Sequence, residues 1–171
     1  RGWEVDDVEF GRKSFGNSYA LPKPFVTDGQ LAPILSKLVE KATYRMRRHG
    51  LAASGVHLAI VYRDGTYWHQ GLAVPEVFAA SDIYRYAWRL LGACPNRKPV
   101  RNLAVSCFNL RRQDSTQLVL FENVLKKRKL VKAIDKINER YGDYVITPAI
   151  MLGTKDNVPD RISFGGIKDM V

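Results

Sequence analysis

The sequence predicts an α+β domain in which two helices alternate with four strands in the order β-α-β-β-α-β. Three observations indicate this fold class: a helix-start signal at 27–30, a turn pair at Asp64-Gly65 between two strand-like runs, and alternating apolar and polar residues over 99–110. The chain has 171 residues, of which 46% are hydrophobic, so its size and composition are those of one globular domain with a core.

The first strand is expected over Lys13 to Leu21, where two prolines follow and end the run. The next helix begins at Thr27, because a threonine side chain can accept from the free amides of the first turn while Gln30 reaches back. Apolar residues then recur at helical spacing, and Gly50 stands where a left-handed residue commonly ends a helix.

A hairpin is expected from Gly55 to Val74, with Asp64-Gly65 as a two-residue turn that permits positive φ angles. If Arg63 lies opposite Thr66, the side chains at 56, 58, 60 and 62 face the core. Arg63, Trp68 and Gln70 then face the other side of the sheet. A register shifted by one residue would instead make Trp68 a core residue.

The second helix is expected to be capped by Ser81-Asp82 and to end near Gly92, with Ile83 and Ala87 in its apolar stripe. The last strand covers 99–110, with the side chains at 103, 105 and 107 alternating against those at 102, 104 and 106. Together these elements predict a ferredoxin-like sheet of four strands that has both helices on one face and leaves the other face open.

After the sheet, the sequence predicts a polar joint, a third helix over 123–141 and an extended tail. The apolar stripe of this helix is expected to consist of Leu130, Ile134, Ile137 and Tyr141, and Gly142 is expected to end it. The expected organisation is a lead (1–12), a sheet domain (13–110), the joint (111–122) and a C-terminal helix with its tail (123–171).

The net charge indicates a polyanionic partner. Lys and Arg number 27 against 17 Asp and Glu, which gives a net charge of +10. Membrane insertion is not expected, because no apolar run approaches the ~18 to 20 residues that a spanning helix needs. Cys94 and Cys107 lack the spacing of a zinc site or a disulfide framework, so a reducing cytoplasm is the expected location.

Patterns typical of catalysis are weak in this sequence. The histidines at 49, 57 and 69 are scattered, and the adjacent carboxylates Asp6 and Asp7 would point to opposite sides of an extended chain. The segment 163–168 lacks the spacing of a phosphate loop. We therefore expect no catalytic residue, no metal site and no cofactor in this chain, and no enzymatic activity from it alone.

Several short patterns are specific only through their order and spacing. They are Lys13-Ser14-Phe15-Gly16, the helix end Arg47-Arg48-His49-Gly50, the hairpin, Ile83-Tyr84 in the second helix, and the closing strand Val100-Arg101-Asn102-Leu103-Ala104-Val105. Over Arg12 to Leu110 the sequence resembles the little-finger domain of bacterial Y-family (translesion, ImpB/MucB/SamB) DNA polymerases. The resemblance implies that the sheet lies in the DNA major groove and grips both backbones. A catalytic palm that uses Mg²⁺ would precede Arg1, and 1–12 would be the linker from it.

The resemblance also implies which residues contact DNA. They are Lys13, Ser14, Gly16, Asn17 and Ser18 in the first strand, and Arg101, Asn102 and Ser106 in the last. From their expected side of the hairpin, Arg63, Trp68 and Gln70 join this set. Gly16 would let the backbone come close to a phosphate. Regular alternation places Asn17 on the inner face, so an outward Asn17 requires a β-bulge at Gly16.

The joint contains the segment Gln117-Leu118-Val119-Leu120-Phe121. It resembles the bacterial sliding-clamp-binding pentapeptide, Gln-Leu-(Ser/Asp)-Leu-Phe, which Y-family polymerases commonly carry just after the little finger. In such a segment Leu120 and Phe121 would enter an apolar pocket while hydrogen bonds hold the Gln117 amide. The expected clamp-binding residues are Gln117, Leu118, Leu120 and Phe121; the alternative is a short strand that packs on the domain.

The hypothesis is thus the C-terminal region of an error-prone translesion DNA polymerase, which binds primer-template or damaged DNA and the β sliding clamp. One alternative is a stand-alone nucleic-acid-binding module similar to an RNA-recognition domain, which would carry stacking aromatic residues on its two central strands. The segment 67–71 fits that pattern poorly. The other alternative, a small enzyme on the same scaffold, would need a convergent cluster of polar side chains that the sequence does not indicate.

Overall fold

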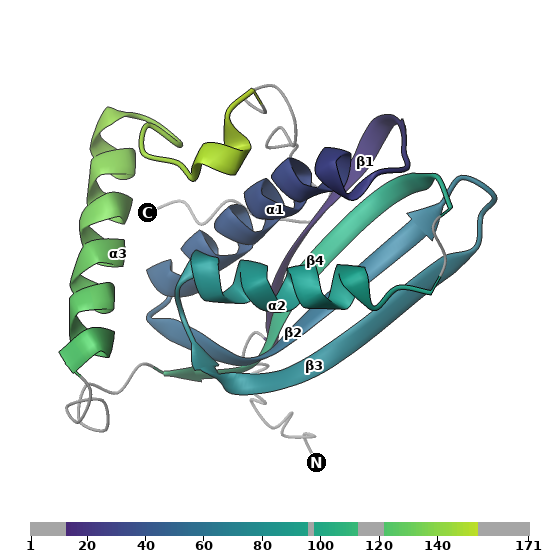
Figure 1. Cartoon of the computed structure of the whole chain (residues 1–171). Coiled ribbons are helices and arrows are strands. Elements are labelled where there is room, and N and C mark those ends of the chain that lie inside the picture. The colour runs from purple at the N-terminus through teal and green to yellow at the C-terminus, as the bar shows by residue number, and fades with distance from the viewer. Residues whose placement is uncertain (1–12, 96–97, 113–121, 154–171) are drawn as a thin grey trace, which may run out of the picture.

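The computed structural model describes residues 13–95, 98–112 and 122–153. Its elements follow the predicted order, with a third helix and a short 3-10 helix after them (Figure 1). They are β1 (Ser14–Phe25), α1 (Asp28–Arg48), β2 (Leu51–Tyr62), β3 (Tyr67–Val77), α2 (Ala80–Gly92), β4 (Val100–Arg112), α3 (Glu122–Tyr141) and η1 (Ala149–Met151). The β-α-β-β-α-β order expected from the sequence is therefore confirmed.

The four strands form one sheet in the order β1-β4-β2-β3, and each neighbouring pair is antiparallel. β4 and β2 are the central strands, and β1 and β3 are the edges. The prediction that β1 ends before its prolines was wrong, because the strand continues through Pro22 and Pro24 to Phe25, with a register shift after Ala20. An edge strand tolerates proline because one side of it lacks a hydrogen-bonded neighbour, and Pro75 likewise lies in the other edge strand, β3.

Both helices cover one face of the sheet, as expected (Figure 1). The core lies between this face and α1 and α2. Its largest fully buried side chains are Ile34, Leu35, Leu38, Val39 and Met46 of α1, Val56, Leu58, Ile60 and Tyr62 of β2, Ile83 of α2, and Leu103 and Val105 of β4. The predicted inward faces of β2 and β4 are confirmed.

The ends of the two sheet-packed helices differ in how well the sequence predicted them. At α1 the capping box is present: the Gln30 amide donates to Thr27 Oγ1 at 3.3 Å, and the Thr27 amide donates to Gln30 Oε1 at 3.3 Å. Gly50 has a φ of +66° beyond its last turn. At α2 the predicted cap was wrong, because Ala79 occupies the N-cap position and makes no side-chain hydrogen bond.

The β2–β3 hairpin has a three-residue loop, Arg63 to Gly65, where the sequence suggested two residues. The Tyr62 amide donates to the Thr66 carbonyl at 2.9 Å, and Gly65 adopts a φ of +83°. Tyr62 therefore lies opposite Thr66, and Ile60 pairs with Trp68. This shift by one residue turns every side chain of β3 to the face opposite to the one predicted.

α3 packs beside α1 and α2 (Figure 1) and makes a polar contact with each of them. The predicted apolar stripe of α3 was partly wrong, since Leu130 and Tyr141 are 60% and 64% exposed. Val124 and Val131 pack instead against a small buried cluster of Ala52, Phe78 and Ala79. The end of α3 was predicted correctly, because Gly142 follows it with a φ of +115°.

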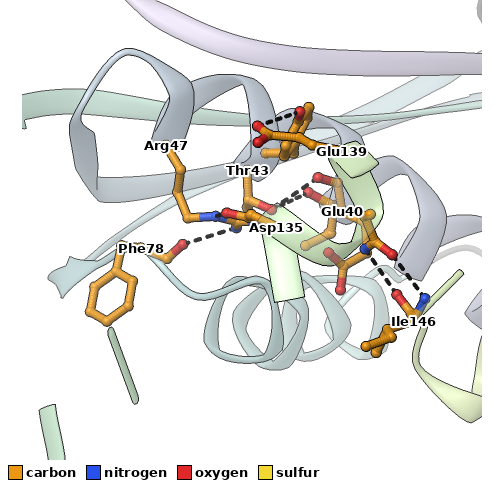
Figure 2. Close-up of polar contacts among 10 residues, drawn as sticks. Glu40, Thr43, Arg47, Phe78, Asp135, Glu139 and Ile146 are labelled. Carbon is orange, nitrogen blue, oxygen red and sulfur yellow. Dashed lines mark hydrogen bonds and ion pairs between the residues drawn. The ribbon is translucent and has the colours of Figure 1, made fainter. Parts of the chain in front are cut away.

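Polar contacts fix α3 to α1 (Figure 2). Arg47 donates to both carboxylate oxygens of Asp135, at 2.6 and 2.7 Å, and to the Phe78 carbonyl at 3.3 Å. Glu40 lies beside this pair. Burial raises the pKa of its carboxyl group, the positive charge of Arg47 lowers this pKa, and the negative charge of Asp135 raises it further. The folded state therefore holds a proton on Glu40 more tightly than the unfolded chain does, so this group favours folding more as the pH falls.

Candidate nucleic-acid interface

The face of the sheet opposite α1 and α2, here called the open face, is lined mainly by small side chains. Its residues pair across the strands in continuous register. They are Ser14, Gly16, Ser18 and Ala20 of β1, Asn102, Ala104, Ser106 and Phe108 of β4, Gly55, His57, Ala59 and Val61 of β2, and Tyr67, His69, Gly71 and Ala73 of β3. Because so many of them are Gly, Ala or Ser, another molecule can approach the backbone of this face closely.

Several of the predicted DNA-binding residues meet on this face. Gly16 pairs with Ser106, and Ala20 pairs with Asn102. A Cβ atom at position 16 would lie 2.9 Å from the Ser106 Cβ, so the close approach of β1 and β4 itself requires a glycine here. Arg45 of α1 also donates to the Gly16 carbonyl at 2.5 Å. Ser14, Gly16, Ser18, Asn102 and Ser106 thus form one contiguous surface.

Three predicted site residues lie on the other face. β1 and β4 pair without interruption from Ser14 to Ala20, so β1 has no bulge at Gly16 and Asn17 faces the helices with Phe15. Trp68 and Gln70 face the same side because of the hairpin register, and Trp68 packs half-buried against the core. The prediction that these two hairpin side chains lie on the open face was therefore wrong.

Cationic side chains stand at both ends of the open face. At one end are Arg63, Lys98 and Arg101; at the other are Lys13, Arg111 and Arg112. Arg101 lies at a β4 irregularity, because Val61 pairs with Asn102 while Tyr62 pairs with Val100. Between the two ends lie the rows of open-face residues that pair across the four strands. In β1 these rows run from Ser14 to Ala20, which is about 20 Å at about 3.3 Å per residue.

At the end of the open face that contains Arg63, Lys98 and Arg101, the positive charge of Lys98 is paired with a carboxylate. Lys98 Nζ lies 2.7 Å from Asp64 Oδ2, and Asp64 Oδ1 accepts from the Thr66 amide and hydroxyl at 3.0 and 2.6 Å. Hydrogen bonds from Lys98 and then from Thr66 lower the pKa of Asp64 to about 2. Among the described residues, Arg63 and Arg101 form no ion pair, so their charges stay available to a partner.

Phe108 is an open-face residue that sequence reasoning missed. Its ring lies over Gly55, where an added Cβ atom would come within 2.4 Å of two ring carbons, and it reaches toward Gly71. A pattern of glycine opposite an aromatic residue on the neighbouring strand signals this arrangement, but only once the pairing of Gly55 with Phe108 is known.

We expect Gly55→Ala to lower the free energy of unfolding by about 1–3 kcal/mol, because the new methyl group must displace the Phe108 ring. Urea unfolding followed by fluorescence measures this loss. In a Phe108→Ala background the same substitution is expected to cost almost nothing, because the clash is gone. Gly29→Ala is the matched control, since a Cβ atom there meets nothing within 4 Å. An equal loss from Gly55→Ala in both backgrounds would contradict the contact.

Two histidines and a tyrosine continue the aromatic surface across β2 and β3. His57 Nε2 lies 3.2 Å from His69 Nδ1, and the Tyr67 ring stacks on His69 with centroids 6.0 Å apart. In the sequence the two histidines are 12 residues apart, on either side of the predicted turn, which suggests that they lie on neighbouring strands. The predicted register, however, placed them on different faces of the hairpin.

No group of three or more His, Cys, Asp or Glu side chains among the described residues could hold a metal ion, so we derive no metal-dependent step for this region. Burial raises the pKa of Cys107 to about 12, which keeps its thiol protonated and unreactive. No helix in the described ranges combines the length and apolar character that crossing a membrane requires. The predicted clamp-binding residues Gln117, Leu118, Leu120 and Phe121 lie outside the described residues.

Comparison with known protein families gives a match over most of the chain. Residues 12–120 match the C-terminal domain of the impB/mucB/samB family. The chain belongs to this family. The matched range contains the whole sheet, α1 and α2, so the open face is part of the impB/mucB/samB domain.

Curated relatives in the impB/mucB/samB family include DNA polymerases. DNA polymerase IV of Pelotomaculum thermopropionicum is 30% identical over 151 residues, which cover 86% of this chain and 38% of that protein. DNA polymerase IV 2 of Bacillus subtilis (strain 168) is 31% identical over 149 residues, which cover 83% of this chain and 36% of that protein. The chain therefore spans little more than a third of the length of these relatives.

Solved structures share the fold. The little-finger domain of polymerase IV, solved in a complex with a beta-clamp processivity factor, aligns with a TM-score of 0.50 at 16% identity and covers 63% of this chain and 97% of that chain. A Y-family DNA polymerase chimera of Dbh and Dpo4 aligns with a TM-score of 0.52 at 19% identity, over 60% of this chain and 30% of that chain. The impB/mucB/samB domain described here thus has the little-finger fold.

The alternative of an RNA-recognition module loses support from the same observations. Such a module carries stacking aromatic residues on both central strands, whereas the open face of β2 has no Phe, Tyr or Trp and that of β4 has only Phe108, whose ring lies over Gly55. Membership of the impB/mucB/samB family favours the polymerase hypothesis instead.

Proposed function

We propose that this chain is the DNA-binding and clamp-binding C-terminal region of a bacterial translesion DNA polymerase, which acts in the tolerance of DNA damage in the cytoplasm. The observation that carries the proposal is the open face, whose small, uncharged middle is flanked by cations at both ends of the strands. Family membership and the little-finger fold support it.

The spacing of the charges suits a duplex. Two phosphate backbones border a major groove about 12 Å wide, and the open face extends about 20 Å between its cationic ends. Arg63 and Arg101 at one end and Arg111 and Arg112 at the other would approach the phosphate backbones, and the small side chains between them would let the sheet lie close against the duplex. Phosphate contacts of this kind position a protein without reading the base sequence.

Two further parts of the proposal lie outside the described residues. Nucleotidyl transfer, with the Mg²⁺ that it uses, would belong to the larger part of the polymerase that this chain does not span. Clamp binding would belong to Gln117-Leu118-Val119-Leu120-Phe121, between β4 and α3. The complex of a beta-clamp processivity factor with the polymerase IV little finger supports a clamp as the partner.

The proposal predicts that the chain binds duplex or primer-template DNA with an affinity that falls steeply with salt. If three to five phosphates are contacted, the association constant falls roughly 40- to 500-fold between 50 and 200 mM salt, because bound counterions are released. Fluorescence anisotropy with a labelled duplex measures this slope. Binding that is absent at 50 mM salt, or that does not change with salt, would contradict the proposal.

A pair of variants locates the contact. Arg63→Gln removes one cation from the end of the open face and is expected to reduce the slope of log K against log salt by about 0.9. Lys136→Gln removes an exposed cation of α3, away from the open face, and is the matched control. The two variants change the net charge equally, so an equal effect of both would mean that DNA does not bind at the open face.

A further inference from the structure

The middle of the open face carries almost no ionisable groups. In its paired rows, the titratable side chains are those of His57, His69 and Tyr67, and the lysines and arginines stand beyond the ends of the rows. His57 pairs with Ser106 on one side and with Gly71 on the other, and His69 pairs with Ala59. The two imidazoles are therefore the groups through which this surface can change its charge near neutral pH.

The contact between the two rings limits how they can ionise. His57 Nε2 and His69 Nδ1 are 3.2 Å apart, so one of these nitrogens carries a proton and the other accepts it. In the neutral pair, the two outer nitrogens, His57 Nδ1 and His69 Nε2, hold one further proton between them. Adding one more proton makes both outer nitrogens N–H donors and leaves the inner contact intact. A second added proton would set two N–H groups against each other and break the contact.

We propose that the His57–His69 pair is a phosphate-binding position that takes up one proton when a nucleic-acid phosphate docks on the open face. The inference rests on the proposed DNA-binding function and specifies a contact within it. A singly protonated pair carries one positive charge and has an N–H donor on each outer nitrogen, and one such donor together with the charge suits a phosphate oxygen. No other described residue of the rows provides a positive charge.

The surroundings of the pair set the direction of the effect. Burial, and then the neighbouring His69, lower the pKa of His57, so its surroundings disfavour the charged form of this imidazole in the free protein. The groups that face it are Tyr67, stacked on His69, and the uncharged Ser106 and Phe108 of β4; no carboxylate lies in the rows to attract the proton. A bound phosphate would raise the pKa of the pair, so DNA affinity must increase as the pH falls through its titration.

The test is the affinity for a labelled DNA duplex between pH 8 and pH 6, at fixed ionic strength and with EDTA present. A rise of one unit in the pKa of the pair on binding raises the affinity by at most about tenfold at a pH below both pKa values, so we expect a gain of roughly three- to fivefold between pH 8 and pH 6. The variant His57→Gln/His69→Gln is expected to lose this gain and change by less than about twofold. His49→Gln is the matched control and is expected to keep the gain, because His49 lies at the C-cap of α1 next to Phe15.

Each outcome distinguishes the two proposals. Salt-dependent binding with a flat pH profile, or a pH gain that persists in the double variant, would overturn the histidine site and leave the DNA-binding function intact. No DNA binding at any pH would overturn both. Because the double variant has to fold for this comparison, an NMR titration of the wild-type histidine ring protons with and without DNA is a second readout. It should show the pKa of the pair rising on binding while that of His49 changes little, and an unchanged pKa would overturn the site.

Discussion

Replacing Leu120 and Phe121 together by alanine is expected to weaken binding of the chain to a bacterial sliding clamp by at least about 100-fold. Large apolar side chains that fill a pocket are typical hot spots, each worth about 2 kcal/mol or more, so the loss of both anchors is expected to cost at least as much as the loss of either one. Titration of the clamp with wild-type and variant chains by calorimetry measures the change. DNA binding should stay within about twofold, because these residues lie beyond the end of β4 and the open face ends before them.

Val119 supplies the matched control for this experiment. It occupies the middle position of the segment, where the usual residue is polar and the side chain is expected to face solvent. Val119→Ala should therefore leave clamp affinity nearly unchanged. If the double alanine variant lost clamp binding, DNA binding and thermal stability together, the segment would be part of the domain core, which is the alternative interpretation of these five residues.

Asp135→Ala is expected to weaken the attachment of α3 to the rest of the molecule. Arg47 would keep its largely buried position, with 11% of its side chain exposed, but would lose the carboxylate that accepts its two short hydrogen bonds. An unpaired buried charge is costly, so the free energy that holds α3 in place should fall by about 2–3 kcal/mol. Hydrogen exchange detects this as faster exchange of α3 amides, while amides of the central strands β2 and β4 keep their protection.

Two further variants test the cause of this loss. Lys136→Ala changes the exposed neighbour of Asp135 and should leave exchange in α3 unchanged. The double variant Arg47→Met/Asp135→Leu removes both charges and should lose less than Asp135→Ala alone, because apolar pairs often replace buried ion pairs without cost. If β2 and β4 lost protection as much as α3, the helix would belong to the same cooperative unit as the sheet.

Local signals in the sequence sufficed for most of the fold. The side chains of Thr27 and Gln30 specify the start of α1 without help from the rest of the molecule, and the alternation over 99–110 specifies which side of β4 is buried. The hairpin register was harder to predict. Asp64-Gly65 favours a two-residue turn, but a three-residue loop that ends at Gly65 also places this glycine at a positive φ. A single residue in the loop then decided the position of Trp68.

The candidate site depended on long-range pairing, which the sequence does not specify. Gly16 and Ser106 were expected on one surface because each lies on a strand with clear alternation, and the structure pairs them directly. Phe108 could not be recognised, because its role depends on Gly55 of another strand. The packing of α3 was also mispredicted: Asp135 and Lys127 make its contacts through charge, and an apolar stripe does not reveal such contacts.

The prolines at the two edges of the sheet have a consequence for the protein in solution. An exposed strand edge is a template onto which a strand from another chain can add, and this is a common route to aggregation. Pro22 and Pro24 in β1 and Pro75 in β3 each lack the amide hydrogen that such an added strand would bind. The prolines therefore interrupt the hydrogen-bonding edge near one end of β1 and near one end of β3, so an added strand could not pair along the full length of either edge.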